Sequence, residues 1–227
     1  MENNNIKNLS TYDNYKPSDI EWIDNIPTHW EITLLKNILN KVISGGTPTS
    51  TQIDFWNGDI NWCNITDMRK SNILKETKKH ITVEGVNNKN LKIIPKNTIL
   101  YSVYATLGRV NITGVETTIN QAILALFENE SKVNKIYLTY YLNFMEKNLL
   151  LFANFTTQYN LSAEIVKNFF LILPSLLEQK QIITFLDKKT SQFKNQVSNI
   201  EKEIELLKEF RKTTINDVVT GKIKVIK

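Results

Sequence analysis

A regular spacing of hydrophobic positions runs through the last quarter of the chain. No proline or glycine occurs between residues 176 and 220, and the candidate seam positions alternate in steps of four and three, the heptad spacing of a coiled coil. We predict one continuous helix, about 65–70 Å long, that ends at Gly221. Its seam predicts a partner helix, and the alternative is a helix folded back on its own domain. The seam consists of Leu186, Thr190, Phe193, Val197, Ile200, Ile204, Leu207, Arg211, Thr214 and Val218.

The middle of the chain has strand-like patterns followed by a helical one. Segments rich in β-branched and aromatic residues predict strands at 98–103, 109–113 and 117–127. Apolar positions at helical spacing then predict a helix over residues 135–155, and a polar patch at 156–160 interrupts it.

A domain boundary is expected at Pro174. A short helix capped by Ser162 and a strand over residues 169–173 precede this proline. We therefore predict an α+β protein. A mixed α/β domain with a β-sheet core occupies residues 1–174, and the long C-terminal coiled-coil helix occupies residues 175–227.

The first part of the chain has weaker patterns. Residues 1–20 read as a loose polar lead-in, and large apolar residues at 22–30 predict a compact anchor. Apolar spacing predicts a helix over residues 31–39. Paired glycines and a proline then break regular structure at residues 44–49. A turn at residues 57–59 and a short strand over residues 60–65 follow.

Composition places the chain among globular proteins of a reducing compartment. Its hydrophobic fraction is 41% and its charged fraction 22%, ordinary values for a folded domain. No apolar run reaches the length of a membrane span, and the polar N-terminal residues show no signal peptide. A single cysteine, Cys63, excludes an internal disulfide. We expect a cytoplasmic protein without a membrane contact. With only His29 and His80 as further soft ligands, we expect no structural zinc.

The net charge of +5 is unevenly distributed along the chain. Residues 69–109, called the basic window below, hold 9 basic and 2 acidic residues, whereas residues 1–68 hold 4 basic and 9 acidic. Residues 110–174 are nearly neutral, and residues 175–227 hold 11 basic and 7 acidic. A local excess of this size is typical of a face that binds a polyanion. The alternative is a solvated, lysine-rich surface.

The sequence contains no recognisable catalytic motif. It has 7 glycines, with neither a glycine-rich methyl-donor loop nor a phosphate-binding loop among them. His29 stands beside Trp30 and is interpreted as a packing residue. We therefore expect no cofactor and no metal. A dispersed nuclease site remains an alternative, and its carboxylates would be Asp54, Asp59, Asp67 and Glu84.

Several short motifs occur in a recognisable order along nearly the whole chain. The opening is Tyr15-Lys16-Pro17-Ser18, Glu21-Trp22-Ile23 and Ile26-Pro27-Thr28-His29-Trp30. Gly45-Gly46-Thr47-Pro48-Thr49 follows, and then Phe55-Trp56-Asn57-Gly58-Asp59-Ile60-Asn61-Trp62. Later come Thr118-Ile119-Asn120-Gln121, Leu173-Pro174, Glu178-Gln179-Lys180-Gln181-Ile182 and Val219-Thr220-Gly221-Lys222-Ile223. In this order they resemble the specificity subunits of type I restriction–modification systems, with Thr49 in place of the usual serine.

The resemblance implies a target recognition domain followed by a conserved-region helix. Typical members hold two such units, with the two helices packed antiparallel as a spacer, whereas this chain has one. The family-like opening and ending favour a natural half-subunit over a fragment of a longer chain. The resemblance also implies double-stranded DNA, a methylation subunit and a restriction subunit as partners. Catalysis would belong to those subunits, and a homodimer through the C-terminal helix is expected.

Candidate DNA contacts follow from side-chain chemistry. Lysines suit phosphate contacts, arginine forks suit guanine edges, and asparagine and glutamine suit adenine. The candidates are Arg69, Lys70, Lys78, Lys79, Arg109, Asn120, Gln121, Gln158, Asn160 and Thr47. For each of them, a surface ion pair or a turn role is the alternative. The four tryptophans, Trp22, Trp30, Trp56 and Trp62, are assigned to the core or to subunit contacts. The expected dimer or subunit interface comprises Leu186, Phe193, Val197, Ile200, Ile204 and Leu207.

Three functions compete at this point. The first is a sequence-specific DNA-binding subunit without catalysis of its own. The second is a non-catalytic coiled-coil scaffold in which the basic window is incidental. The third is a stand-alone nuclease with dispersed carboxylates. Salt-dependent DNA binding separates the first from the second, and metal-dependent cleavage by the purified chain would support the third.

Overall fold

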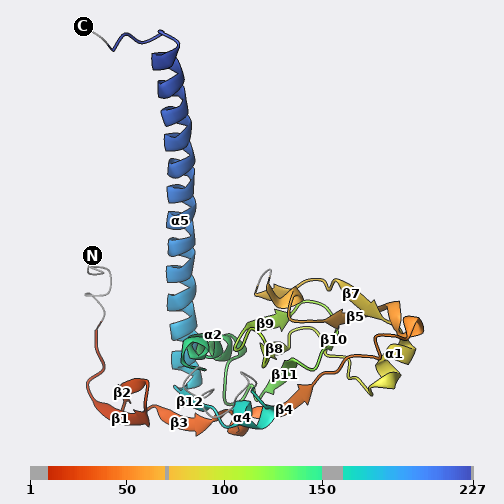
Figure 1. The fold of residues 1–227 in the computed structure, drawn as a ribbon. Helices are drawn as coiled ribbons and strands as arrows, with labels where there is room; N and C mark the ends of the chain where they lie inside the picture. The colour runs from red at the N-terminus through yellow and green to blue at the C-terminus, as the bar shows by residue number, and fades with distance from the viewer. Residues whose placement is uncertain (1–9, 70–71, 150–160, 226–227) are drawn as a thin grey trace. The chain divides into compact units, whose positions relative to one another are not determined.

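The computed structural model describes residues 10–69, 72–149 and 161–225 (Figure 1). The chain divides into two compact units, the first ending at Lys180 and the second beginning at Gln181. All strands of the described residues belong to the first unit, and most of helix α5 (Leu176–Val219) belongs to the second. The predicted α+β fold class and the long C-terminal helix are therefore confirmed.

The described chain begins with a β-hairpin, where the sequence predicted a loose polar segment up to residue 20. Strand β1 (Tyr15–Ile20) pairs antiparallel with strand β2 (Ile23–Pro27). Period-two burial places a few apolar side chains on one face, which is enough to hold a short hairpin on a neighbouring cluster. That cluster contains Ile20, Ile26 and Ile172, with Trp22, Trp30 and Tyr141 packed against it. The compact anchor predicted over residues 22–30 is confirmed.

The helix predicted over residues 31–39 is wrong. The segment forms strand β3 (Glu31–Leu34), a single 3-10 turn η1 (Leu35–Asn37) and the start of strand β4 (Leu39–Ser44). The turn buries Leu35 and Ile38, and these two contributed to the helical spacing. Strand pairing on both sides overrides the local pattern, because β3 pairs with β12 (Phe170–Leu173) and β4 pairs with β11 (Ile123–Glu128).

Two sheets form the core of the first unit. The five-stranded sheet has the order β4-β11-β8-β9-β6, and the three-stranded sheet has the order β10-β5-β7 (Figure 1). The remaining strands are β5 (Trp56–Cys63), β6 (Ile73–Leu74), β7 (Lys79–Ile81), β8 (Ile99–Ser102), β9 (Val110–Thr113) and β10 (Thr118–Ile119). Strand β8 is buried along its whole length, as expected of a central strand covered on both faces. The strands predicted at 98–103 and 109–113 are confirmed.

The segment predicted as one strand over residues 117–127 is two strands in different sheets. Strand β10 pairs parallel with β5, whereas β11 pairs antiparallel with β4 and β8. A turn separates them, in which the side chain of Asn120 accepts a hydrogen bond from the backbone N–H of Ala122 at 3.1 Å. Asparagine competes with strand pairing in this way, because its side chain bonds to backbone groups two residues on.

Short elements connect the sheets. The 3-10 turns η2 (Ile53–Phe55) and η3 (Asp67–Arg69) flank β5, and helix α1 (Val83–Asn88) follows β7. The turn predicted at 57–59 is wrong, because these residues lie within β5, at a register shift between Trp56 and Ile60. The strand predicted over residues 60–65 forms the later part of β5, which ends at Cys63. Asn57 has a φ of 61°, a value that asparagine tolerates better than most residues.

Helices α2 (Lys135–Met145) and α4 (Ala163–Lys167) lie between β11 and β12 in the described part of the chain. Helix α2 begins where the sequence predicted, is capped by Asn134 and continues into the 3-10 turn η4 (Glu146–Asn148). The later part of the predicted helix lies outside the described residues. Helix α4 is capped by Ser162, whose hydroxyl accepts the N–H of Ile165 at 3.2 Å, as predicted. Strand β12 then leads to α5.

The first turn of α5 is fixed to the first unit by a buried amide. The side chain of Gln179 has 0% exposure. Its Oε1 accepts the N–H of Asn134 at 2.7 Å, and its Nε2 donates to the carbonyl of Pro174 at 2.9 Å. Beyond this anchor the helix continues to Val219, and Gly221 has a φ of 74°, as expected of a helix-ending glycine. No helix of the described residues is long and apolar enough to cross a membrane.

A second anchor of the same turn is the carboxylate of Glu178. Its Oε1 accepts hydrogen bonds from His29 Nε2 at 2.7 Å and from Trp30 Nε1 at 2.9 Å, and its Oε2 accepts the hydroxyl of Ser175 at 2.7 Å. Burial raises the pKa of Glu178, but these hydrogen bonds outweigh burial and lower the pKa from 4.5 to about 2. The charged form of Glu178 is therefore favoured by folding.

Glu178→Gln is expected to destabilise the protein by about 1–2 kcal/mol near neutral pH, because the hydrogen bonds to a charged acceptor are weakened. The folded-state pKa lies below the unfolded one, so the stabilisation is complete above about pH 4.5 and is lost as the pH falls towards about 2. Urea unfolding between pH 2.5 and 7 measures this difference. Glu130→Gln, at an exposed carboxyl of the same unit, is the control. A difference between Glu178→Gln and wild type that stays constant with pH would contradict the assignment.

Candidate nucleic-acid interface

Two motifs far apart in the sequence meet in the structure. The N–H of Gly46 donates to the carbonyl of Ile119 at 2.9 Å, and the hydroxyl of Thr47 donates to Oε1 of Gln121. A Cβ added at Gly45 would overlap the carbonyl oxygens of Ile119 and Asn120, so this close approach requires glycine. These contacts fix residues 45–49, called the glycine-containing segment below, against the Thr118-Ile119-Asn120-Gln121 segment. Of the predicted DNA contacts, Thr47, Asn120 and Gln121 are brought together.

The polar side chains at this junction already have internal partners. The Oδ1 of Asn120 caps its own turn, as described above, and the backbone N–H of Asn120 donates to the carbonyl of Cys63 at 3.0 Å. Gln121 is exposed and accepts from Thr47, while Asn120 is half-buried. The junction is therefore fixed by its own hydrogen bonds, and Gln121 is the exposed one of its three polar side chains.

Two tryptophans also form hydrogen bonds to the glycine-containing segment. The Nε1 of Trp62 donates to the carbonyl of Gly46 at 3.0 Å, and the Nε1 of Trp56 donates to the carbonyl of Thr49 at 3.3 Å. The two rings meet edge to face with centroids 5.2 Å apart, a favoured arrangement for aromatic pairs. The assignment of Trp62 to the core is confirmed, because it is buried beside Ile81.

A lysine of the basic window lies against this aromatic pair. The Nζ of Lys79 is 5.3 Å from the ring centroid of Trp56 and 6.0 Å from that of Trp62, within the range of a cation–π contact. The sequence showed a basic window and separate tryptophans, and no signal in it predicted their contact. The rings therefore limit where the Lys79 ammonium can lie, next to the segment that carries Thr47.

The neighbouring lysine is positioned through its backbone. Asp67 is buried; its Oδ2 accepts the N–H of Asn64 at 3.0 Å and its Oδ1 accepts the N–H of Lys78 at 3.2 Å. The carboxylate thus ties the start of β7 to the loop that leads into η3, where Arg69 lies. The side chain of Arg69 and all of Lys70 lie outside the described residues. Asp67 has a structural role here, which argues against a catalytic one.

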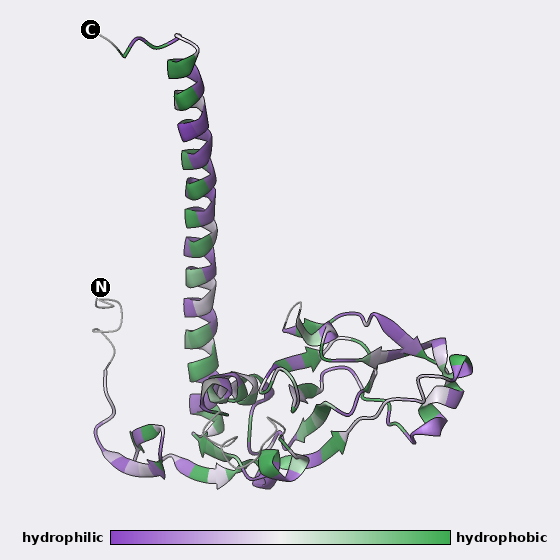
Figure 2. Ribbon diagram, in the orientation of Figure 1, coloured by the Kyte–Doolittle hydropathy of each residue, from purple (hydrophilic) through white to green (hydrophobic). Residues whose placement is uncertain are grey.

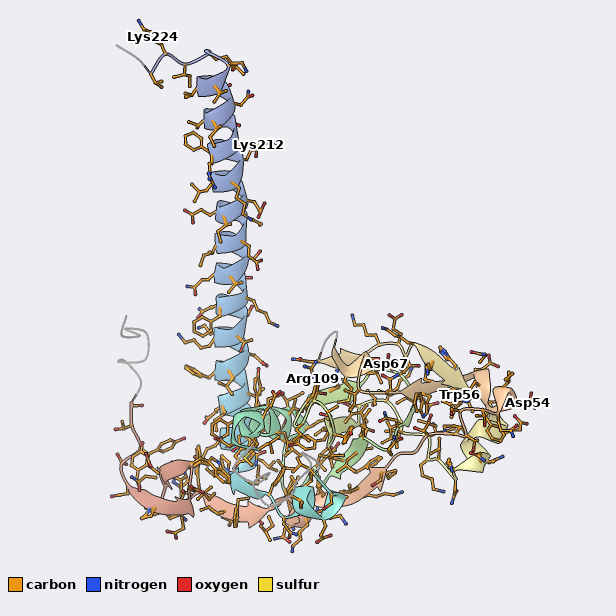
Figure 3. The ribbon with its side chains drawn as sticks, viewed as in Figure 1. Asp54, Trp56, Asp67, Arg109, Lys212 and Lys224 are labelled. Atoms are coloured by element: carbon orange, nitrogen blue, oxygen red, sulfur yellow. The ribbon has the colours of Figure 1, made fainter. Side chains whose placement is uncertain are left out.

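Arg109 lies directly before β9, a strand of the five-stranded sheet. Its backbone N–H donates to the hydroxyl of Ser102 at 3.0 Å, and its carbonyl accepts the N–H of Ser102 at 2.9 Å. Its side chain is half-buried at the start of β9. Figure 3 shows Arg109 and Trp56 on separate parts of the first unit. The structure therefore does not bring Arg109 to the contact of Lys79 with Trp56. Gln158 and Asn160 lie outside the described residues.

The lysines of the basic window that the structure describes are open to solvent. All six of them are exposed: Lys75, Lys78, Lys79, Lys89, Lys92 and Lys96. Exposed lysines of this kind suit contacts with phosphate. Among the residues that the structure describes, no group of three or more His, Cys, Asp or Glu side chains could hold a metal ion.

On helix α5 the predicted seam lies on the surface of the single chain. Phe193, Val197, Ile200, Ile204 and Leu207 are all exposed, and Leu186 is partly buried. Figure 2 shows hydrophobic positions recurring along the helix between hydrophilic ones. An exposed apolar stripe of this kind is typical of an interaction surface.

Comparison with known proteins identifies the family. The model of the type I restriction modification DNA specificity domain matches residues 27–206. The chain is 29% identical over 201 residues to the type I restriction enzyme HindI specificity subunit of Haemophilus influenzae, covering 87% of this chain and 42% of that protein. It is 28% identical over 196 residues to the MjaIX specificity subunit of Methanocaldococcus jannaschii, covering 85% and 44%. The chain spans about half the length of the curated relatives it matches.

Solved structures share the fold. The HsdS subunit from Thermoanaerobacter tengcongensis matches with a TM-score of 0.59 and 22% identity, over 76% of this chain and 40% of that one. A chain from a structural study of complex assembly and conformational transition in a type I R-M system matches with a TM-score of 0.68 and 22% identity, over 87% and 47%. The family expected from the sequence motifs is confirmed by the domain match, and the chain belongs to the family of type I restriction modification DNA specificity domains.

Proposed function

We propose that the chain is a non-catalytic recognition subunit that selects a DNA sequence for a type I restriction–modification complex. Residues 1–174 are the target recognition domain and residues 175–227 the dimerisation and docking helix. The observation that carries the proposal is made at the start of β7, where Lys78 and Lys79 are exposed. The Nζ of Lys79 lies against the ring of Trp56. Trp56 in turn donates a hydrogen bond to the segment that carries Thr47. Family membership supports the same assignment.

A dimer formed through α5 would bind a bipartite target. One recognition domain reads one short half-site, and a second copy joined through α5 supplies the other. Two identical chains related by a two-fold axis bind an inverted repeat with an unread spacer, since the DNA shares the symmetry of the dimer.

Docking of the methylation and restriction subunits is assigned to α5 as well. Leu206 and Phe210 lie outside the heptad seam and are 66% and 70% exposed. Because they are four residues apart, they lie together on one face of the helix, and Phe210 borders Leu207 of the seam three residues away. They are therefore suited to contact a further helix, which we assign to the methylation subunit.

Two other functions are less well supported. A coiled-coil scaffold uses α5 but gives no role to the exposed lysines at the start of β7, and salt-independent DNA binding would favour it. A nuclease needs clustered carboxylates, whereas Asp67 bonds to the backbone of its own loop. Metal-dependent cleavage of DNA by the purified chain would favour the nuclease.

Lys78→Ala combined with Lys79→Ala is expected to weaken binding to all DNA sequences alike. Each lysine that neutralises a phosphate adds about 0.9 to the slope of log K against log salt, so the double variant should flatten that slope by about one to two. Fluorescence anisotropy with duplex DNA at several salt concentrations measures both effects.

Lys41→Ala is the matched control, because this exposed lysine of β4 lies outside the basic window. It should leave the salt slope within error of the wild type. An unchanged slope in the double variant would remove β7 from the interface and with it the main support for DNA recognition by this surface.

A further inference from the structure

The seam of α5 contains one charged residue, Arg211, at a position where coiled coils normally hold an apolar side chain. Arg211 is exposed in the single chain, and so is Phe193 of the same seam, at 58%. We infer that Arg211 of one chain stacks on Phe193 of a second copy, which fixes an antiparallel register of the two helices centred on residue 202. The inference rests on the dimer proposed above.

Parallel pairing is disfavoured by the same arginine. The seam alternates between two kinds of heptad position, and in a parallel pair each residue faces its own copy. Arg211 would then face the partner's Arg211 in the seam, which places two like charges together away from water. An antiparallel pair places each residue opposite the other kind of seam position, so the two arginines are separated.

Antiparallel registers differ by steps of one heptad, and Arg211 distinguishes between them. Its facing residue in the successive registers is Leu186, Phe193, Ile200, Leu207 or Thr214. Only Phe193 offers an aromatic face, on which the planar guanidinium can stack while its edge stays hydrated. An aliphatic partner gives the charge no such contact.

The register that joins Arg211 with Phe193 also matches the other polar positions of the seam. It places Thr190 opposite Thr214, so the two hydroxyl-bearing residues share a layer. A shift of one heptad would place Thr190 opposite Leu207, or Thr214 opposite Val197. The remaining layers are wholly apolar: Ile200 with Ile204, Val197 with Leu207, and Leu186 with Val218.

This register sets where the two recognition domains join the helix pair. With the centre at residue 202, the Gln181 positions of the two copies lie at opposite ends, about 60 Å apart along the pair at 1.5 Å per residue. The central layers, which contain Ile200 and Ile204, are apolar. The two layers that pair Arg211 with Phe193 flank this centre symmetrically, and they distinguish this register from the others.

A double-mutant cycle on the full chain tests the register. Phe193→Arg places Arg opposite Arg in two layers, and sedimentation equilibrium should show the dimer weakened by about 100-fold or more. Arg211→Phe places Phe opposite Phe and should leave the dimer intact. The combined variant Phe193→Arg with Arg211→Phe restores one Arg–Phe pair per layer, and its dissociation constant should return to within about tenfold of wild type.

Leu206→Arg is the control, since it introduces the same charge at an exposed apolar position of the same helix outside the seam and should leave the dimer unchanged. Circular dichroism of each variant verifies that the helix is formed. A combined variant as weak as Phe193→Arg, with a dimeric wild type, would overturn the register and leave the dimer proposal standing. A monomeric wild type at high protein concentration would overturn the dimer and the register together.

Discussion

Ile200→Glu combined with Ile204→Glu is expected to convert the protein to monomers and to abolish its binding to paired DNA sites. In the single chain these side chains are 55% and 45% exposed, so the substitutions cost little there. In the proposed dimer they face each other across the two-fold axis, and four carboxylates would enter the seam without partners. We expect the dimer dissociation constant to rise by more than about 100-fold, since each uncompensated buried charge costs several kcal/mol.

Sedimentation equilibrium and binding to a duplex with two half-sites measure the two consequences. Leu206→Glu, at an exposed apolar position of the same helix outside the seam, is the control and should remain dimeric. The double variant should keep the unfolding transition of the first unit, because the substitutions lie in the second. An asymmetric methylated motif in the host genome would contradict the symmetric dimer and indicate a two-domain partner chain.

The long helix was predictable because its signal is local and sustained. Heptad spacing over residues 186–218 without proline or glycine specifies a helix regardless of tertiary context. The segment 31–39 shows the opposite case. Its apolar spacing also suited a helix, but pairing of β3 with β12 and of β4 with β11 decided the outcome. Those pairings join residues distant in sequence, which a local pattern does not reveal.

The candidate site was predictable in its parts and not in its assembly. The motifs that contain Thr47 and Gln121 were recognised separately, and the hydrogen bond that joins them is a product of the tertiary fold. The contact of Lys79 with Trp56 was missed for the same reason. Arg109 was grouped with these lysines by charge along the sequence, but it lies next to β9, which belongs to another sheet than β7.

The motifs that carried the family resemblance serve mainly to hold the structure together. Glu178 and Gln179 fix the first turn of α5, and Thr47 with Gln121 locks two segments of the first unit. Such residues make internal contacts, so they would be the same whichever DNA sequence is read. Residues that hold the fold together are thus distinct from residues that read bases. For this reason the motifs identified the family but did not indicate which side chains read bases.

Gly45→Ala is expected to disrupt the junction of these two segments, although Gly46→Ala, one residue later, is expected to be tolerated. A Cβ at Gly45 would overlap the backbone carbonyl oxygens of Ile119 and Asn120, which have no freedom to rotate away. A Cβ at Gly46 would lie 3.0 Å from Cδ2 of Leu91, the end of a flexible side chain. Forced overlap with backbone costs about 3 kcal/mol or more, whereas the shift of a side-chain methyl costs less than about 1 kcal/mol.

Thermal unfolding of the two variants provides the comparison. For a unit of this size, about 3 kcal/mol lowers the Tm by about 6–12 °C, and Gly45→Ala should show a fall in this range while Gly46→Ala stays within about 3 °C of wild type. DNA affinity, measured well below both transitions, should fall only in Gly45→Ala, because Thr47 and Gln121 are separated there. Equal Tm values for the two variants would show that the backbone contact at Gly45 does not hold the junction. A Gly45→Ala protein that is destabilised but binds DNA with wild-type affinity would place the DNA contacts away from Thr47 and Gln121.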